Sequence, residues 1–236
     1  MTERIKVVFL LPAFNESAVL GDVIIELQKA VKKKKYESLI VVIDDGSTDE
    51  TGNIASASGV QIIRHILNTG SGGATSTGIR FAKQQGATIA ATLDADGQHK
   101  ISDVLNGVDI MLKNDIDLLI GSRLINSEGM SKIKILGNKG LSFITGLLFG
   151  VNVTDYQSGL RLYSQKSITT LRWRSVGYEF CSEMLWRAKQ QGLIVNEYPI
   201  EAIYSDYSIA KGQNNWNAVN IVKSLIKHRI VELFGE

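Results

Sequence analysis

The sequence predicts an α/β fold built on a doubly wound, mostly parallel sheet. Residues 5–11 and 39–43 are short, nearly continuous runs of β-branched and aliphatic residues, which is typical of strands buried on both faces. Between them, residues 18–33 carry apolar side chains at helical spacing, so the three segments form a β-α-β unit. Because the same alternation continues to residue 121, we expect right-handed crossovers and helices on both faces of the sheet.

The remaining elements follow in chain order. Strands are expected at 60–66, 88–93, 117–121 and 194–199, and helices at 49–58, 74–85, 101–113, 180–191 and 218–233. After residue 124 the alternation weakens, because residues 126–140 are polar and basic and residues 141–153 are mostly apolar. That apolar stretch is shorter than the roughly 18 to 20 residues that a membrane-spanning helix needs. We therefore expect a protein that is soluble or lies on a membrane surface.

Composition excludes several classes of protein. Of the 236 residues, 44% are hydrophobic and 21% are charged, and only two are proline, so the chain is neither disordered nor collagen-like. Its one cysteine, Cys181, excludes a disulfide framework and a cysteine-rich zinc site. The formal net charge of +2 is too close to zero to indicate a polyanionic partner, so we expect no nucleic-acid partner.

A polar segment follows every strand of the first half of the chain. These segments are 12–16, 44–49, 68–73, 94–99 and 122–123, and several carry acids or glycines. The carboxyl ends of parallel strands meet at one edge of the sheet, which is where ligands bind in doubly wound folds. The segments therefore predict a binding site at that edge.

Asp94 and Asp96 are the leading candidates for metal ligands. Side chains two apart on an extended segment point the same way, so both carboxylates can approach one hard cation, and Gln98 can add an amide oxygen. Oxygen ligands suit Mg²⁺ or Mn²⁺, which commonly share their coordination with substrate phosphates. The alternative is an acidic first turn of the following helix, which needs only one acid.

The acids at the end of the second strand allow two interpretations. Asp44 and Asp45 stand where an acid commonly contacts a ribose or base in nucleotide-binding folds. Residues 47–49 are also suited to cap the next helix. Asn15 and Glu16 allow the same two interpretations: they cap the start of a helix, or they contact a nucleotide.

Residues 68–73 form a glycine-rich turn before a helix, and its amides suit a pyrophosphate. This raises a dinucleotide-binding oxidoreductase as an alternative function. Against that class, Thr75 stands where a third glycine is needed, and the turn follows the third strand instead of the first.

Six motifs occur in a fixed order along the chain. They are Pro12-Ala13-Phe14-Asn15-Glu16, Asp44-Asp45-Gly46-Ser47-Thr48-Asp49, Asn68-x-Gly70-x-Gly72-x-Ala74, Leu93-Asp94-Ala95-Asp96-Gly97-Gln98-His99, Gly121-Ser122-Arg123 and Asp155-x-Gln157-Ser158-Gly159. The set resembles glycosyltransferase family 2, in its branch of dolichol-phosphate and polyprenyl-phosphate sugar synthases. The resemblance implies a GT-A fold, which is Rossmann-like with a C-terminal acceptor-side extension. It implies one domain, 1–236, with a nucleotide-sugar-binding half at 1–123 and an acceptor-side half at 124–236.

The resemblance also implies a nucleotide-diphosphate sugar as donor, either GDP-mannose or a UDP-sugar. The implied substrate-binding residues are Pro12, Ala13, Asn15, Glu16, Asp44, Asp45, Gly72, Gln157, Ser158 and Lys211. Lys211 stands in a stretch where relatives carry a Ser-Lys pair that closes over the diphosphate. Asp94, Asp96 and Gln98 would coordinate the divalent cation, Mn²⁺ or Mg²⁺, which neutralises the leaving diphosphate while the anomeric carbon is inverted.

The implied acceptor is dolichyl or polyprenyl phosphate, held by Arg123 and by Lys134, which stands where arginine is expected. A phosphate monoester is largely dianionic at neutral pH and attacks without a general base, so positioning and charge neutralisation would carry catalysis. The alternative acceptor is a hydroxyl of a glycan or lipid-linked oligosaccharide, which needs a carboxylate base, either Asp155 or Glu183. A third hypothesis is a non-catalytic nucleotide-sugar-binding module.

Two segments with apolar and basic residues, 139–151 and 218–233, are suited to lie on a membrane surface. The alternative for both is a helix packed within the domain. With a lipid phosphate as acceptor, we expect a peripheral protein at the cytoplasmic face of the membrane.

Overall fold

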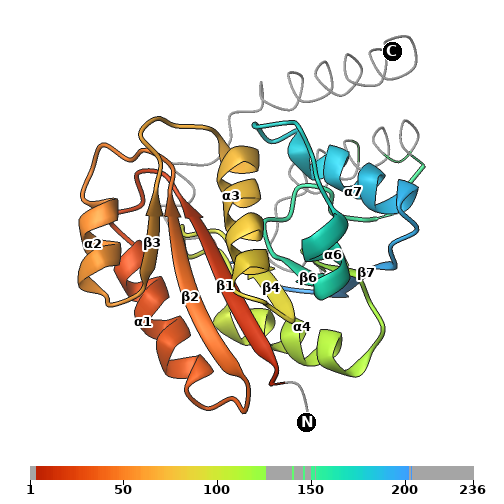
Figure 1. The fold of residues 1–236 in the computed structure, drawn as a ribbon, viewed down its shortest axis with the longest axis horizontal. Helices are drawn as coiled ribbons and strands as arrows, with labels where there is room; N and C mark the ends of the chain where they lie inside the picture. The colour runs from red at the N-terminus through yellow and green to blue at the C-terminus, as the bar shows by residue number, and fades with distance from the viewer. Residues whose placement is uncertain are drawn as a thin grey trace.

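The computed structural model describes residues 4–125, 140, 146, 150, 151, 153–201 and 203. Its centre is a seven-stranded sheet in the order β3-β2-β1-β4-β6-β5-β7 (Figure 1). The strands are β1 (Lys6–Ala13), β2 (Glu37–Asp44), β3 (Gln61–Arg64), β4 (Ile89–Thr92), β5 (Leu118–Ser122), β6 (Arg161–Ser164) and β7 (Val195–Pro199). Neighbouring strands are parallel except where β6 pairs with β4 and β5, which confirms the α/β, mostly parallel fold.

Helices cover both faces of this sheet. They are α1 (Leu20–Val31), α2 (Thr51–Ala57), α3 (Ser71–Gln84), α4 (Ile101–Lys113), α6 (Gln165–Thr170) and α7 (Phe180–Gln190) (Figure 1). One apolar core joins alternate residues of β1 to α1 and α4, and a second joins the other residues of β1 to α3 and α7. Phe9 belongs to the first core and Leu10 to the second, which explains why β1 reads as a continuous apolar run.

Strand β6 was not predicted from the sequence. It has four residues, begins with an arginine, and runs antiparallel between β4 and β5. So short a segment with a charged residue lacks the apolar run by which the other strands were recognised. Because β4 and β5 precede residue 124 and β6 follows it, the two halves of the chain share one sheet.

Helix α3 begins at Ser71, three residues earlier than predicted. Gly70 stands at its N-cap with a φ of +82°. The amides of Gly72 and Gly73 donate to the carbonyl of Val176, at 2.7 and 3.3 Å. This carbonyl comes from a segment about a hundred residues away and satisfies first-turn amides that would otherwise need a cap.

Within the described residues, none of the helices has the length and apolar character needed to cross a bilayer. The predicted helix at 218–233 and the basic residues 126–139 lie outside the described residues, as do most of residues 141–149.

Candidate active site

Asp94 follows β4 at the carboxyl edge of the sheet, and its side chain is 51% exposed. Its Oδ2 atom lies 3.0 Å from Nε2 of the buried His99. A Cβ atom at Gly159 would lie 2.2 Å from Oδ2 of Asp94, so a larger residue there would displace the Asp94 carboxylate. The hydroxyl of Thr92 donates to the carbonyl of Gly159 at 3.0 Å. These contacts bring the 94–99 motif and the 155–159 motif together.

Asp94 and Asp96 repel each other. Desolvation and the charge of Asp94 raise the pKa of Asp96 to about 6, and Glu16 adds to the repulsion. For Asp94 itself, desolvation is outweighed by the contact with His99 and by nearby guanidinium charges, so its pKa is lowered. A divalent cation between two such carboxylates would relieve the repulsion, so this pair fits the predicted metal.

A cation at this pair would share its coordination with substrate. Among the described residues there is no cluster of three His, Cys, Asp or Glu side chains placed to hold a metal ion. Mg²⁺ and Mn²⁺ sites commonly combine one or two carboxylates with water and substrate phosphates. The pair Asp94 and Asp96 is therefore suited to a cation that arrives with a diphosphate.

Gln98 is fixed to the same turn through its backbone. Its amide donates to Asp96 Oδ1 at 3.0 Å, and its carbonyl accepts from the amide of Ile203 at 2.9 Å. The side-chain amide of Gln98 stays a predicted metal ligand.

Gln157 and Ser158 carry polar atoms that lack partners. Both side-chain amide atoms of Gln157 and the hydroxyl of Ser158 are buried and have no hydrogen bond within the described part of the chain. Buried polar groups are normally hydrogen-bonded, so unpaired ones call for an explanation. Because Gly159 lies against Asp94, these atoms are candidates for binding a substrate at the same site.

Arg123 and Asp155 form a two-pronged ion pair. Nε and Nη2 of Arg123 donate to the two carboxylate oxygens of Asp155 at 2.7 and 2.9 Å, and the Arg123 amide adds a third hydrogen bond at 3.2 Å. Burial alone would raise the pKa of Asp155, but the Arg123 guanidinium outweighs it and holds that pKa below its usual range. Asp155 is therefore a weak base at neutral pH.

Glu183, the other candidate base, is buried in the first turn of α7. Its carboxylate accepts hydrogen bonds from the amides of Arg174 and Ser175, the shortest at 2.8 Å. Burial opposes ionisation, but these hydrogen bonds and the charge of Arg187 lower its pKa. Glu183 thus holds the segment before α7 in place and is also a weak base.

Asp44 is fully buried at the end of β2. Its Oδ1 atom accepts from the amide of Ser47 at 2.9 Å. Its Oδ2 atom lies 3.0 Å from Nε of Arg64, as an ion pair without hydrogen-bond alignment. A direct contact between Asp44 and a nucleotide would require this ion pair to open.

Asp45 is also buried, and both of its oxygens are occupied. Oδ1 accepts from the amide and hydroxyl of Thr69 at 2.9 and 2.7 Å and lies 2.7 Å from Nδ1 of His65. Oδ2 accepts from the amide of Gly70 at 2.8 Å. Asp45 therefore ties the end of β2 to the glycine-rich turn.

The 12–16 segment is joined to the loop after β2. Pro12 and Ala13 end β1 and pair with Ile43 and Asp44 of β2. Beyond them, the side chain of Asn15 accepts from the Thr48 amide at 2.9 Å, and the amide of Glu16 donates to the Thr51 hydroxyl at 2.8 Å. Asp49 holds the start of α2, because its Oδ1 atom accepts from the Thr51 amide at 2.9 Å, but the N-cap residue itself is Glu50, whose side chain makes no capping hydrogen bond.

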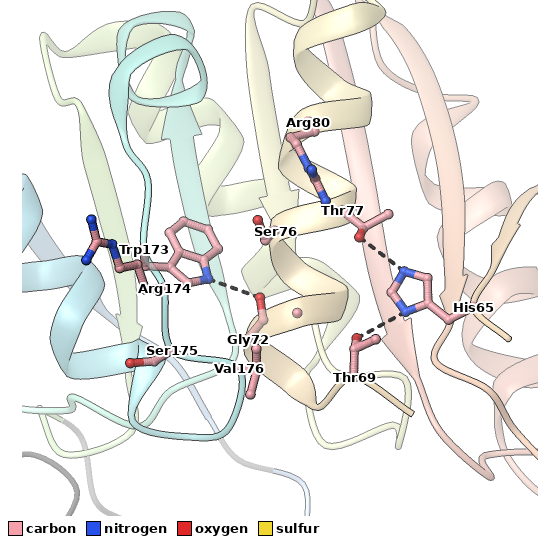
Figure 2. A pocket seen from close by; sticks show the side chains of 11 residues that line it. His65, Thr69, Gly72, Ser76, Thr77, Arg80, Trp173, Arg174, Ser175 and Val176 are labelled. Atoms are coloured by element: carbon pink, nitrogen blue, oxygen red, sulfur yellow. Dashed lines mark hydrogen bonds between the residues drawn. The ribbon is translucent and has the colours of Figure 1, made fainter. Parts of the chain in front are cut away.

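Gly72 is packed between α3 and the segment before α7. Its amide donates a hydrogen bond to the carbonyl of Val176, and its carbonyl accepts one from the indole of Trp173 at 3.0 Å (Figure 2). A Cβ atom at Gly72 would lie 2.5 Å from the carbonyl oxygen of Ser175. Its amide, which the sequence suggested for a phosphate, has an internal partner in this structure.

A family model described as "Glycosyl transferase family 2" matches residues 8–172 of the chain. The chain belongs to glycosyltransferase family 2. It is therefore an enzyme of the glycosyltransferase class, as the ordered motifs predicted.

Two relatives of this family 2 glycosyltransferase match along most of their length. An uncharacterised protein of Methanocaldococcus jannaschii is 42% identical over 224 residues, covering 93% of this chain and 90% of the relative. The UDP-N-acetylglucosamine–dolichyl-phosphate N-acetylglucosaminyltransferase of Methanococcus voltae is 39% identical over 232 residues, covering 89% of this chain and 90% of the relative.

Among solved structures, glucosyl-3-phosphoglycerate synthase of Mycobacterium tuberculosis has the same fold. Its complex with Mn²⁺, uridine diphosphate and phosphoglyceric acid gives a TM-score of 0.73 at 19% identity, covering 99% of this chain and 79% of that chain. The likeness confirms the GT-A fold of this glycosyltransferase.

Arg161 is the residue of this glycosyltransferase site that sequence reasoning missed. It begins β6, is 1% exposed, and donates through Nη2 to the carbonyl of Tyr156 at 2.7 Å. Its charge contributes to lowering the pKa of both Asp94 and Asp155. The available signal was a charged residue between apolar neighbours in Leu160-Arg161-Leu162-Tyr163, since arginine is rarely fully buried.

Lys134 and Lys211, which the resemblance assigns to the acceptor and the donor, lie outside the described residues of the glycosyltransferase. Their roles stay predictions.

Proposed function

We propose that this enzyme transfers a sugar, with inversion, from a nucleotide-diphosphate sugar to dolichyl or polyprenyl phosphate, with Mn²⁺ or Mg²⁺ as cofactor. The Methanococcus voltae relative is named for a UDP-sugar donor and a dolichyl-phosphate acceptor, which favours both parts of the proposal. The Mn²⁺ and uridine diphosphate bound by the solved neighbour favour the cation.

The choice of acceptor rests on one observation: both candidate bases have hydrogen-bonded carboxylates and lowered pKa values. A hydroxyl acceptor must lose a proton as it attacks, so it needs a carboxylate with a free oxygen and an ordinary or raised pKa. Asp155 is held at both oxygens by Arg123, and Glu183 is held by backbone amides. A phosphate acceptor needs no base, because it is already largely dianionic at neutral pH.

The proposed roles follow from where each group lies. Asp94, Asp96 and Gln98 would hold the cation, which neutralises charge on the departing diphosphate when bound. The unpaired amide of Gln157 and hydroxyl of Ser158 would orient the donor beside Asp94. Arg123, with 19% of its side chain exposed, would hold the acceptor phosphate while Asp155 fixes the direction of its guanidinium fork.

The donor pocket is proposed at the other loops of the same edge. Pro12, Ala13, Asn15 and Glu16 would line the base and ribose, with Asp45 holding the adjoining turn. Residues 1–123 would form the nucleotide-sugar half and residues 124–236 the acceptor half, with Lys134 and Lys211 as added cationic contacts. A lipid phosphate is presented at a bilayer, so we also propose that the enzyme works at the cytoplasmic membrane face.

The test is a transfer assay with labelled UDP-N-acetylglucosamine, UDP-glucose and GDP-mannose in the presence of Mn²⁺. Dolichyl phosphate is the acceptor, and dolichol, which has a hydroxyl in place of the phosphate, is the matched control. We expect product with dolichyl phosphate and one of the donors, and none with dolichol. Transfer to dolichol, or to neither lipid while a glycan hydroxyl is glycosylated, would contradict the proposed acceptor.

A further inference from the structure

His99 stands at the end of the 94–99 motif, and the proposed transfer gives it no role. Its side chain is only 3% exposed, and its Nε2 atom lies 3.0 Å from Oδ2 of Asp94. Helix α4 begins two residues later and has Lys100 as its N-cap. The hydrogen bond of His99 therefore goes to the acid after β4 and not to the start of the next helix.

The other nitrogen of the His99 ring has no partner. Its Nδ1 atom is buried and makes no hydrogen bond within the described part of the chain. A buried polar atom without a partner costs free energy, and an apolar side chain of similar size would fill the same space without that cost. Packing alone thus does not account for a histidine here, whereas the contact from Nε2 to Asp94 requires one of the few side chains that can donate a hydrogen bond.

This contact occupies one oxygen of Asp94 and leaves the other free. Within the described residues, Oδ2 of Asp94 contacts His99, while Oδ1 accepts no hydrogen bond. Asp96 is arranged in the same way, because its Oδ1 atom accepts the Gln98 amide at 3.0 Å and its Oδ2 atom accepts no hydrogen bond from the described residues. Each carboxylate is held through one oxygen and keeps one oxygen for a cation.

The backbone of Gly159 limits the Asp94 carboxylate on a second side. Both oxygens of Asp94 lie so close to Gly159 that a Cβ atom there would overlap them. The carboxylate is therefore bounded by the Gly159 backbone and by the His99 ring. A ligand whose direction is fixed before the cation arrives loses less conformational entropy when it binds.

We propose that His99 is a positioning residue for the cation: its Nε2 atom holds Oδ2 of Asp94 and so leaves Oδ1 as the metal ligand. The inference rests on the proposed function, because it takes Asp94 as a ligand of Mn²⁺ or Mg²⁺. Groups that hydrogen-bond to a metal ligand fix its orientation, and their loss typically lowers metal affinity by about 10- to 100-fold. In this role His99 acts only through Asp94.

The experiment is Mn²⁺ titration by calorimetry in the presence of uridine diphosphate, with thermal unfolding of each preparation. His99→Leu keeps a side chain of similar size and removes the hydrogen-bond donor. His99→Gln retains an N–H at a similar distance from the backbone, and His99→Asn carries the same amide one methylene closer to the backbone. The matched control is His65→Leu, because Nδ1 of His65 lies 2.7 Å from Oδ1 of Asp45, in the other acidic pair.

We expect His99→Leu and His99→Asn to bind Mn²⁺ at least about tenfold more weakly than the unchanged chain. His99→Gln should recover most of that loss, and His65→Leu should bind as the unchanged chain does. In the transfer assay, His99→Leu should need more Mn²⁺ for its half-maximal rate and approach the unchanged rate at saturating Mn²⁺. A purely structural role would lower the unfolding temperature without changing the Mn²⁺ affinity.

Two results overturn the role of His99. One is a Mn²⁺ affinity of His99→Leu equal to that of the unchanged chain. The other is equal affinity of His99→Gln and His99→Asn, which decides the question even where His99→Leu does not fold. Titration of Asp94→Asn separates this inference from the proposed function, because Mn²⁺ binding that survives Asp94→Asn contradicts the metal site itself. Weaker binding by Asp94→Asn without weaker binding by His99→Leu overturns only the role of His99.

Discussion

Two pairs of acidic residues follow buried strands of the same sheet, and their surroundings differ. Asp44 and Asp45 are buried, and amides, a hydroxyl, a histidine and an arginine occupy their oxygens. Asp94 is half exposed, and its repulsion helps to raise the pKa of Asp96 to about 6. The difference separates two uses of acids that follow a strand: Asp44 and Asp45 hold neighbouring loops together, whereas Asp94 and Asp96 keep a mutual repulsion that a bound cation would relieve.

The largest effect is expected from Asp94 and Asp96, which we call the open pair. Asp94→Asn removes a proposed metal ligand and should lower transfer to dolichyl phosphate by roughly 1,000-fold, equivalent to about 4 kcal/mol, because charge on the leaving diphosphate is no longer neutralised. The unfolding temperature should change little, since the side chain is half exposed. Initial rates and thermal unfolding of the same preparations check both parts, and a rate within about tenfold of the unchanged enzyme would contradict the assignment.

The charge of Arg161 lowers the pKa of Asp94 and of Asp155, and the next largest effect is expected at this arginine. Arg161→Met removes the hydrogen bond to the Tyr156 carbonyl and a buried cation whose charge acts on Asp94 and Asp155, and it should lower the free energy of unfolding by about 3 kcal/mol. Arg161→Lys keeps the charge but loses the guanidinium fork, so it should recover only part of that loss. Urea unfolding measures the series, and equal stability of Arg161→Met and the unchanged chain would show that the buried charge is not needed.

Substitution in the occupied pair, Asp44 and Asp45, should lower stability, whereas substitution in the open pair should lower activity. Asp45→Asn places an amide group among donors that need an acceptor, and it should lower the free energy of unfolding by about 2 kcal/mol and the unfolding temperature by roughly 4 to 8 °C. The control is Asp22→Asn, at an exposed acid of α1. If Asp45→Asn is as stable as that control, then the hydrogen bonds around Asp45 do not stabilise the fold.

The smallest effect concerns Glu183, another occupied acid, and it depends on pH. Because hydrogen bonds lower the folded-state pKa of Glu183 below the usual 4.5, its stabilisation is present above about pH 4.5 and is lost as pH falls through the folded-state value. Glu183→Gln should therefore be less stable than the unchanged chain by about 1 kcal/mol at pH 7, with the difference shrinking below pH 4.5. Thermal unfolding across pH, with Glu26→Gln at an exposed position as control, tests this, and a difference that persists at low pH would contradict it.

The parts of the fold that depend on local sequence could be predicted. The alternation of strands and helices from residue 5 to 121 follows from apolar periodicity, and the positions of Asp94 and Asp96 follow from the strand before them. The contacts that occupy the carboxylate of Asp45 could not be predicted, because His65 and Thr69 reach it from a different loop.

Contacts between distant segments explain the other differences. The early start of α3 depends on Val176, and the place of β6 between β4 and β5 depends on pairing across the two halves. The role of Arg161 depends on the charges of Asp94 and Asp155, which come from two further loops. Periodicity and spacing carry information along the chain, whereas these features are set by which segments meet in space.

The most direct test of the account is Mn²⁺ titration by calorimetry in the presence of uridine diphosphate. The unchanged chain should bind Mn²⁺, and Asp45→Asn should do so as well below its unfolding temperature, whereas Asp94→Asn should bind at least about tenfold more weakly. This result would locate the cation at the open pair. Binding of Mn²⁺ by Asp94→Asn with the affinity of the unchanged chain would contradict it.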